Sequence, residues 1–490
     1  MSPEHSSPQP AAAPTTVVIG GGMSGLIYAW ELARAGHPVT VVEADAHVGG
    51  AVWSHTIGGV ESHTGAEAFA IGRGAVLGLV KDLGLEDRVV SPATGTSFIV
   101  SDTGAYPSPR SAIMGMPSRP LAADVRRALG LPGALRAWAE RLLPARYGLT
   151  PGVSIGEFVR KRYGRRVLER LVAPIIQGVH SADPHRFELA AVMPTLPAAV
   201  QKHGSAQKAI EHMLAERGTR SGSGAAVHSL TPSMAALPKA LAAQIEEAGG
   251  RILTGSPVSA VRADGTRWHV STADGTQLEA DRLVVAVGPE VARTLLAEAA
   301  PEVAALVPTA PATPVRLASL ALDTPELDQK PRGNGVLVAP GTRSIRAKAM
   351  THASAKWEHI GAAAREVAPG RHVVRLSYGR GASAESVPEA SEFPALAVQD
   401  AARILGIAPE RLTLVDWAIT DWVGTMRQTG PGHTAALAEL DAALDARGEA
   451  AAPPLLFTGA WRAGNGLEAI TRFTRALAQA STRPQEEAVS

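Results

Sequence analysis

Three glycines spaced as G-x-G-x-x-G stand where the backbone can approach a phosphate group closely. They are Gly20, Gly22 and Gly25. The first permits a tight turn, the second leaves room for a pyrophosphate, and the third lets a helix pack on a strand. Glu43 follows roughly 20 residues later, where a carboxylate can accept hydrogen bonds from ribose hydroxyls. This spacing predicts a dinucleotide site.

The elements around these glycines form the pattern of a βαβ unit. Residues 15–19 are apolar and mostly β-branched, as in a buried strand, and an apolar helical periodicity follows to about residue 35. The start of that helix offers free N–H groups, with Met23 and Ser24 beside the glycines, and the positive end of its dipole. Residues 38–42 read as a second buried strand.

A second glycine pair selects the kind of dinucleotide. Gly49 and Gly50 follow Glu43 after five residues, and Ala51 comes next. The E-x5-G-G extension resembles a large flavoprotein group that includes amine oxidases, phytoene desaturases and porphyrinogen oxidases, in which this pair passes close to FAD. Small residues at Gly65 and beyond would suit backbone lying against a cofactor. The alternative is an NAD domain with a chance Gly-Gly pair.

Composition limits the chemistry and the partners. The 490 residues allow two or three domains. They include no cysteine, which excludes disulfides, thiolate metal sites, iron–sulfur clusters and a dithiol relay. Redox work would therefore belong to the flavin. A formal charge of +1 gives no electrostatic case for nucleic acid.

Membrane insertion is not expected. Residues 1–14 are polar and Pro-rich, predict a disordered tail and lack the apolar core of a signal peptide. No apolar run approaches the roughly 18 residues that span a bilayer. We therefore expect a cytoplasmic protein with at most peripheral membrane contact. The Arg- and Lys-rich helical pattern at 154–176 is either a surface for anions or, more commonly, a solvated face.

The last strand–turn–helix pattern, residues 455–482, points a second helix N-terminus at a ligand. Glycines at 459, 464 and 466 separate the strand from the helix. If the ligand is the pyrimidine edge of a flavin, the helix dipole stabilises the negative charge of the reduced form. The flavin would then be contacted by Gly459, Ala460, Gly466 and Leu467. The alternative is a βα unit that contacts no ligand.

Over residues 15–480 the chain resembles the protoporphyrinogen/coproporphyrinogen oxidase family of bacterial type. The resemblance rests on the glycine fingerprint and on GAEAF (65–69), MGMPS (114–118), VLERLVAPIIQGVHSADP (167–184), RQTGPGH (427–433) and TGAWRAGNGLEAI (458–470). It implies an α/β fold with a Rossmann-like FAD-binding domain, a sheet-based substrate domain and a helical insertion. It also implies cofactor contacts from Gly65, Ala66, Glu67 and Val258, and hydride transfer to the flavin with O2 as the final acceptor.

The predicted division of the chain follows this resemblance. Disordered tails are expected at 1–14 and 483–490, and a flexible loop at 201–227. The FAD-binding domain takes 15–90, 228–300 and 451–482, the substrate domain takes 91–113 and 301–450, and the helical domain takes 114–200.

Four segments depart from the family pattern. Ala51 replaces the usual Arg or Lys, His63 replaces an acid, Thr-Pro-Ser-Met at 231–234 replaces a Gly-Gly-Met segment, and the run 462–466 is unusual. We name His63, His180 and Arg462 as candidate catalytic residues, with His63 as a proton acceptor or flavin-tuning group. His180, Asp183 and His185 have a spacing that metals use, but the resemblance favours a loop there and no metal.

Three functions remain open on these grounds. The first is an FAD oxidase that dehydrogenates a reduced nitrogen-containing small molecule, such as an amine or N-heterocycle of specialised metabolism, with O2 as acceptor. The second is a porphyrinogen oxidase of haem biosynthesis. The third is a flavin-holding partner protein without turnover. The expected assembly is a monomer or homodimer.

Overall fold

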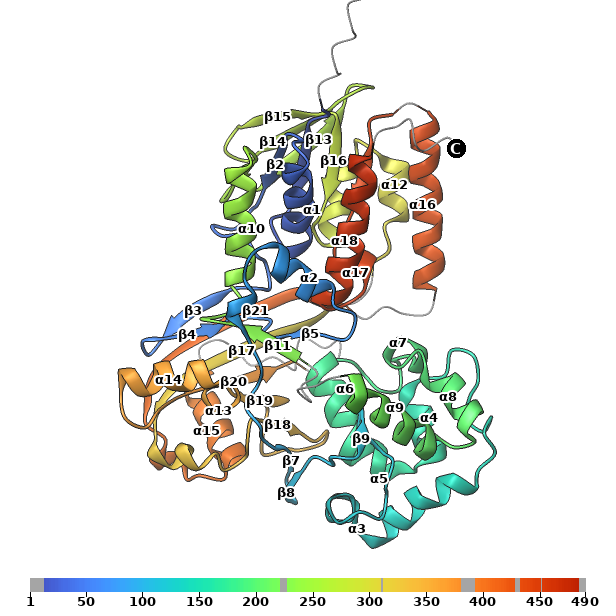
Figure 1. Ribbon diagram of the computed structural model, residues 1–490, viewed down its shortest axis with the longest axis vertical. Helices are drawn as coiled ribbons and strands as arrows, with labels where there is room; N and C mark the ends of the chain where they lie inside the picture. The colour runs from blue at the N-terminus through green and yellow to red at the C-terminus, as the bar shows by residue number, and fades with distance from the viewer. Residues whose placement is uncertain are drawn as a thin grey trace, which may run out of the picture.

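The computed structural model contains three domains, arranged around a shared centre (Figure 1). A parallel-sheet domain lies at the top of the view, a mixed-sheet domain at the lower left and a helical domain at the lower right. This confirms the expected α/β class with a second sheet and a helical insertion. The structure describes residues 13–220, 227–309, 312–379, 393–427, 432–450 and 452–483.

The parallel-sheet domain is built on five short strands in the order β12-β2-β1-β16-β22. Each pairs in parallel with its neighbours, and β1 lies between β2 and β16. Strand order therefore reverses at β1, which opens a crevice at the carboxyl ends of the strands. The strands are β1 (Thr16–Ile19), β2 (Val39–Val42), β12 (Arg251–Leu253), β16 (Arg282–Val285) and β22 (Leu455–Phe457).

Alternate side chains of β1 enter two separate apolar cores, because successive residues of a strand face opposite sides. Four helices share the core that contains Val18: α1 (Met23–Arg34), α2 (Ala75–Asp82), α10 (Ala236–Glu247) and α18 (Leu467–Thr482). The core that contains Val17 takes in β13 (Val258–Ala263), β14 (Trp268–Thr272), β15 (Gln277–Ala280), α11 (Pro289–Leu296), α12 (Pro301–Leu306) and α16 (His433–Glu449).

The mixed-sheet domain has seven strands in the order β21-β17-β20-β19-β18-β7-β8. All neighbours are antiparallel except β18 and β7. The strands are β7 (Ser97–Ser101), β8 (Gly104–Pro107), β17 (Ala312–Asp323), β18 (Gly335–Val338), β19 (Ala349–His352), β20 (Arg371–Tyr378) and β21 (Leu414–Arg427). Its helices are α13 (Ala353–Lys356), α14 (Glu358–Val367) and α15 (Phe393–Leu405).

The helical domain has its own apolar core, into which β7 and β8 also send side chains. Its main helices are α3 (Ala123–Trp138), α4 (Ile155–Arg162), α5 (Arg165–Val167), α6 (Ala173–His180), α7 (Leu189–Val192), α8 (Leu196–His203) and α9 (Ala206–Arg220). A π-helical turn, Leu168–Val172, joins α5 to α6. Smaller strand pairs are β3 (Ser54–Ile57) with β4 (Val60–His63), β9 (Ala112–Ile113) with β10 (Met116–Pro117), and β5 (Phe69–Ala70) and β6 (Val89–Val90) on either side of β11 (Val227–Leu230).

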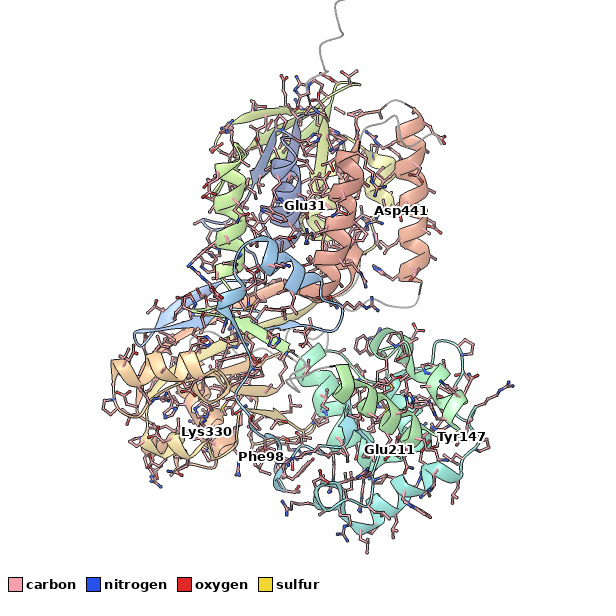
Figure 2. The ribbon with its side chains drawn as sticks, in the orientation of Figure 1. Glu31, Phe98, Tyr147, Glu211, Lys330 and Asp441 are labelled. Carbon is pink, nitrogen blue, oxygen red and sulfur yellow. The ribbon has the colours of Figure 1, made fainter. Side chains whose placement is uncertain are left out.

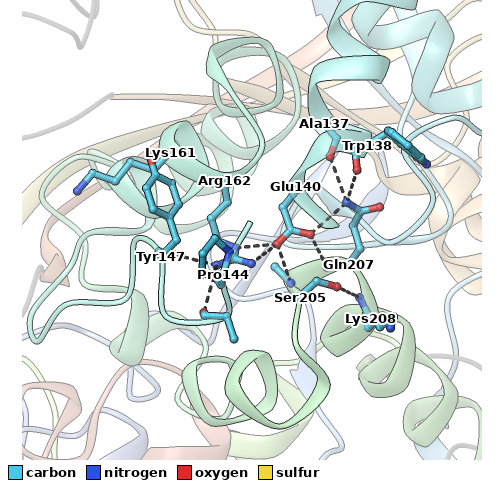
Figure 3. Close-up of polar contacts among 12 residues, drawn as sticks. Ala137, Trp138, Glu140, Pro144, Tyr147, Lys161, Arg162, Ser205, Gln207 and Lys208 are labelled. Carbon is cyan, nitrogen blue, oxygen red and sulfur yellow. Dashed lines mark hydrogen bonds and ion pairs between the residues drawn. The ribbon is translucent and has the colours of Figure 1, made fainter. Parts of the chain in front are cut away.

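A buried ion pair is an exception, at one residue, to the solvated face expected for the basic stretch at 154–176. Arg162 has no exposed side-chain surface, and its Nε donates to the Glu140 carboxylate over 2.7 Å (Figure 3). Its Nη1 donates to backbone carbonyls, among them that of Tyr147 at 2.8 Å. Arg166 and Arg170 likewise donate to carbonyls of α3. Arg162 therefore joins helices from within the core, whereas Arg160, Arg165 and Arg166 remain exposed.

The flexible loop expected at 201–227 is instead mostly helix. Helix α9 begins at Ala206, where Glu140 accepts the N–H groups of Ala206 and Gln207, so a buried acid caps its first turn. Ala209 and Ile210 bury its inner face. The continuous Gly/Ser-rich run that suggested flexibility begins at Gly218, and residues 221–226 lie outside the described part.

Domain boundaries also differ from the prediction at two places. Helices α12 and α16 fall within the 301–450 segment assigned to the substrate domain, but their apolar residues Val303 and Leu440 pack in the core of the parallel-sheet domain. The hairpin β3–β4 falls within the segment 15–90, but Ile57 and Val60 pack against α14 and β17 of the mixed-sheet domain. In both places the apolar side chains decide the boundary, because a segment belongs to the domain whose core those side chains enter.

Candidate flavin site

The turn from β1 into α1 has the geometry that its glycines predicted. Gly20 has a φ of 105°, and a Cβ on Gly25 would lie 1.9 Å from the carbonyl oxygen of Gly20. Both positions therefore exclude larger residues. A Cβ on Gly22 would meet no atom within 4 Å, so the space before α1 is open. Met23 and Ser24 follow in the buried first turn.

Glu43 lies at the end of β2, beside this turn. Its Oε2 accepts the N–H of Gly21 at 2.6 Å and its Oε1 that of Asp45 at 2.9 Å. The β12–β13 connection lies against the same segment, because Ser256 donates its N–H to the carbonyl of Glu43. Val258, two residues on, begins β13. The predicted adenine-side residues thus come from three neighbouring segments.

The second glycine pair approaches the first turn directly. Gly49 forms an isolated parallel bridge with Gly22, and its N–H donates to the carbonyl of Gly21 at 2.8 Å. Gly49 has a φ of 107° and Gly50 a φ of 55°. A Cβ on Gly49 would lie 2.6 Å from the carbonyl oxygen of Val52. This tight backbone packing brings the two fingerprints together in space.

Residues 63–67, here called the 63–67 loop, lie against the segment that follows Gly50. The N–H of Ala66 donates to the carbonyl of Ala51 at 2.8 Å, and that of Thr64 to the carbonyl of Trp53 at 3.0 Å. A Cβ on Gly65 would lie 2.2 Å from the Ala51 oxygen, so only glycine allows this approach. The loop and the second glycine pair therefore form one continuous backbone surface.

A cluster of charges holds the end of this loop. Glu67 pairs with Lys356 of α13 and, at 3.1 Å, with Arg375 of β20. Burial alone would raise the pKa of the Glu67 carboxyl. The charges of Lys356 and Arg375 outweigh it and lower that pKa to about 2. Glu67 is therefore ionised and paired at neutral pH.

His63 is buried at the start of the loop. Its side chain is 2% exposed, and burial, together with the charge of Arg375, lowers its pKa to about 3. The imidazole is therefore neutral at physiological pH. Its Nε2 and the neighbouring Thr64 Oγ1 are buried without a hydrogen-bond partner. Such atoms are rare in proteins and are commonly completed by a ligand or water.

The C-terminal strand–turn–helix reaches the same end of the sheet. Strand β22 leads into Gly459 and Ala460, and α18 begins after Gly466, which has a φ of 97°. Leu467 packs in the core that also contains Met23, Val48 and Val52. Its neighbour Glu468 accepts the N–H groups of Ala75 and Val76, at 2.8 and 3.1 Å, and so anchors α18 to α2.

Comparison with known proteins now decides the family. Residues 23–471 match the family model of flavin containing amine oxidoreductases. The chain belongs to this family. It is therefore a flavin-dependent oxidoreductase, as the fingerprint predicted.

Relatives within this amine oxidoreductase family include porphyrinogen oxidases. The coproporphyrinogen III oxidase of Bacillus subtilis (strain 168) is 29% identical over 488 residues, which cover 95% of this chain and 97% of the relative. The human protoporphyrinogen oxidase is 30% identical over 329 residues, 60% of this chain and 64% of the relative.

Solved structures of the family share the fold. A provisionally named protoporphyrinogen oxidase from Exiguobacterium sp. 255-15 has a TM-score of 0.80 at 22% identity, over 96% of this chain and 99% of that one. Cyclohexylamine oxidase from Brevibacterium oxydans IH-35A has a TM-score of 0.66 at 16% identity, over 96% and 99%. At these identities the likeness concerns the fold alone.

The residues present fit a flavin dinucleotide. The open space before α1 would receive a pyrophosphate, and Glu43 has the place of the ribose acceptor. The unpartnered polar atoms of His63 and Thr64 belong to the loop whose backbone N–H groups donate to Ala51 and Trp53. In the described part of the chain, no three His, Asp or Glu side chains gather as metal ligands would.

Of the three catalytic candidates, Arg462 has its partners on other elements of the parallel-sheet domain. Arg462 of α17 (Ala460–Ala463) pairs with Asp441 at 2.7 Å, and its guanidinium lies over the Phe473 ring. Figure 2 labels Asp441 on α16. His180 ends α6, and its side chain lies outside the described part. Most of the RQTGPGH segment, residues 428–431, is outside it too. His63 begins the loop whose backbone pairs with Ala51 and Trp53.

The sequence did not reveal the side chains that hold the 63–67 loop. Arg375, Lys356 and Trp422 come from the mixed-sheet domain, about 300 residues later. A cation within the apolar strand HVVRLSY was the available sign for Arg375, since buried charges need partners. Nothing local pointed to Glu67 as its partner.

A separate pocket of about 420 Å³ lies where β4, α14 and the 231–232 turn meet. Its lining residues are Glu61, Arg88, Thr231, Pro232, His359, Ile360 and Ala363. None of the predicted cofactor residues is among them. Glu61 accepts hydrogen bonds from Ser233 Oγ at 2.6 Å and from Ser54 Oγ at 2.7 Å. The 231–234 segment, which differs from the family pattern, is therefore bound to strand β4.

The described helices do not meet the requirements for spanning a membrane. Within residues 13–483, leaving aside the gaps named above, no helix combines the length and apolar character needed to span a bilayer.

Proposed function

We propose that this protein binds FAD without a covalent link and oxidises a reduced, nitrogen-containing small molecule, with O2 as electron acceptor. The observation that carries this proposal is the glycine-lined surface from Gly22 through Gly49 to Gly65, with open space at the start of α1. When bound, the flavin would supply the hydride acceptor.

The chain's own residues would bind and orient both molecules. The first N–H groups of α1 would hold the pyrophosphate, and Glu43 would accept from ribose. The α18 N-terminus, starting at Gly466, would stabilise negative charge at the flavin's pyrimidine edge. His63, neutral and with an unpartnered Nε2, would accept a hydrogen bond from the cofactor or substrate side.

For the substrate, we propose a smaller amine or N-heterocycle rather than a porphyrinogen. His63 stands where the family pattern has an acid, and it lies on the 63–67 loop with its Nε2 unpaired. Ala51, the backbone partner of this loop, lacks the family's cation. One altered polar partner changes discrimination by roughly 10–100-fold, so several together could redirect the site.

A porphyrinogen is the second candidate, and the relatives favour it. Coproporphyrinogen III oxidases match nearly the full length of the chain at 29% identity. If this candidate is right, the departures at Ala51, His63 and 231–234 are neutral changes.

Cofactor binding is tested first. Protein denatured after purification should release one FAD per chain, and Gly25→Val should release none, because its side chain would collide with the carbonyl oxygen of Gly20. Gly448→Val is a matched control, since Gly448 lies in α16, without a positive φ and with open space at its Cβ. Absence of flavin from both the purified and the FAD-reconstituted wild type would refute the proposal.

Turnover is tested with the holoenzyme. We expect peroxide release with a reduced amine or N-heterocycle from a substrate panel, and no NAD(P)H requirement. Coproporphyrinogen and protoporphyrinogen, mixed anaerobically with the enzyme in a stopped-flow cell, should bleach the flavin slowly. Rapid bleaching by either would establish the second candidate, and no turnover of any compound would favour a flavin-holding protein.

A further inference from the structure

We propose that Arg375 is a positioning residue that fixes the 63–67 loop and raises the reduction potential of the flavin beside it. This inference rests on the proposed function, because it requires a flavin at the glycine-lined surface. Arg375 lies in the mixed-sheet domain, so it would connect the domain that receives substrate to the group that is reduced.

The contacts of Arg375 follow the loop backbone. One terminal nitrogen donates to the carbonyls of His63 and Gly65, at 3.1 and 2.8 Å, and the other to the Glu67 carboxylate at 3.1 Å. A planar guanidinium with several fixed donors can bind three acceptors along one segment; a lysine ammonium is a single compact donor group. The side chain is 13% exposed.

Neighbouring side chains complete the hold on this loop. Trp422 of β21 donates its indole N–H to the carbonyl of Thr64 at 2.7 Å, and Ser229 of β11 donates to that of Glu67 at 2.7 Å. Four of the five loop carbonyls are thus bound by side chains distant in sequence. The loop's backbone is therefore fixed by surrounding elements, while His63 Nε2 and Thr64 Oγ1 remain available to a ligand.

The charge of the cluster favours a reduced flavin. Lys356 and Arg375 contribute two positive charges against one negative charge on Glu67, and His63 is neutral. The balance is one positive charge in a region largely removed from water, where electrostatic interactions are strong. A fixed positive charge stabilises the negative charge that the flavin gains on reduction.

The experiment compares flavin reduction potentials by anaerobic equilibration with reference dyes. Arg375→Gln removes the positive charge and two or more of the donors. It should make flavin reduction at least tenfold less favourable, which is about 30 mV for a two-electron couple. Glu67→Gln removes the negative charge with little change in shape, and should shift the potential in the opposite direction. A merely structural role would not produce two opposite shifts.

Arg371→Gln is the matched control. Arg371 lies on the same strand, pairs with Asp323 and donates to the carbonyl of Gly58, away from the 63–67 loop. The Arg371→Gln variant should lose about as much folding stability as Arg375→Gln, and its flavin reduction potential should equal that of the wild type. Equal shifts in Arg371→Gln and Arg375→Gln, or no shift in a flavin-loaded Glu67→Gln, would overturn the inference. If Arg375→Gln does not fold, Glu67→Gln and Arg375→Lys test the inference instead. Arg375→Lys keeps the positive charge, so it should keep the potential while it loosens the loop. A wild type that binds no flavin would instead refute the proposed function.

Discussion

Two buried clusters, one around Glu140 and one around Glu67, each pair a carboxylate with arginine. They differ in how fully the polar atoms around the carboxylate are hydrogen-bonded. In the helical domain, Glu140 and Arg162 are fully buried. The Glu140 carboxylate accepts from Arg162, from the N–H groups of Ala206 and Gln207, and from the Gln207 side chain (Figure 3). Both of its oxygens are occupied by protein donors.

Beside the 63–67 loop, Glu67 is also paired, by Lys356 and Arg375, but its surroundings are incomplete. His63 Nε2 and Thr64 Oγ1 are buried there without partners. The cluster also retains a net positive charge. The fully bonded Glu140 carboxylate, in the turn after α3, joins α4 to α9. A cluster with unpartnered polar atoms beside a glycine-lined surface indicates a place for a ligand.

The largest expected effect is at Glu140 in the helical domain. Glu140→Ala leaves the Arg162 guanidinium buried without its counter-ion and uncaps α9. We expect a loss of about 3–5 kcal/mol in the free energy of unfolding, measured by urea denaturation. The flavin content of the protein that remains folded should not change. Loss of flavin in folded protein would show that the two clusters are coupled.

A smaller loss is expected from Glu67→Ala. Lys356 and Arg375 are 22% and 13% exposed, and Arg375 keeps two backbone acceptors, so water and the loop compensate in part. We expect a loss of about 2–3 kcal/mol in unfolding free energy. FAD affinity, measured by reconstitution of the apoprotein, should fall about tenfold. A stability loss equal to that of Glu140→Ala would contradict the comparison.

The pH dependence of stability should report His63. Its folded pKa of about 3 lies below its unfolded value of about 6.5, so the unfolded chain binds more protons between these values. The stability contribution of neutral His63 is therefore complete above pH 6.5 and declines as pH falls toward 3. At pH 5 the loss is about 2 kcal/mol.

His63→Asn should reduce this acid loss, measured as the difference in unfolding free energy between pH 7.5 and pH 5. His269→Asn is a control, because His269 is a surface residue that pairs with Asp264 on the β-meander. An identical pH dependence in wild type and His63→Asn would mean that His63 is not held neutral.

The smallest effect should come from an exposed pair in the helical domain. Arg119 and Glu211 lie 3.2 Å apart, with side chains 71% and 55% exposed. Arg119→Ala should change the unfolding free energy by less than about 1 kcal/mol, and added salt should remove the difference. A loss comparable to that of Glu140→Ala would mean that burial is not what separates these pairs.

The sequence by itself determined the nucleotide-binding turn. Gly20, Gly25 and Gly49 are required by backbone conformation and by contacts within a few ångströms of main chain, which is why their spacing is readable. The strand and helix patterns around them rest on local periodicity, and they agree with β1, α1 and β2. The family, the fold class and the flavin follow from these short-range requirements.

Only the tertiary structure decided which charged residues are structural and which border the site. Arg162 lies within a basic run that suggested a solvated face, yet it is buried because Glu140, on another helix, receives it. Arg375 meets His63 and Glu67 across more than 300 residues. The charge of an arginine is visible in sequence, but its partner is set by the packing of separate domains, and this long-range pairing has no local pattern.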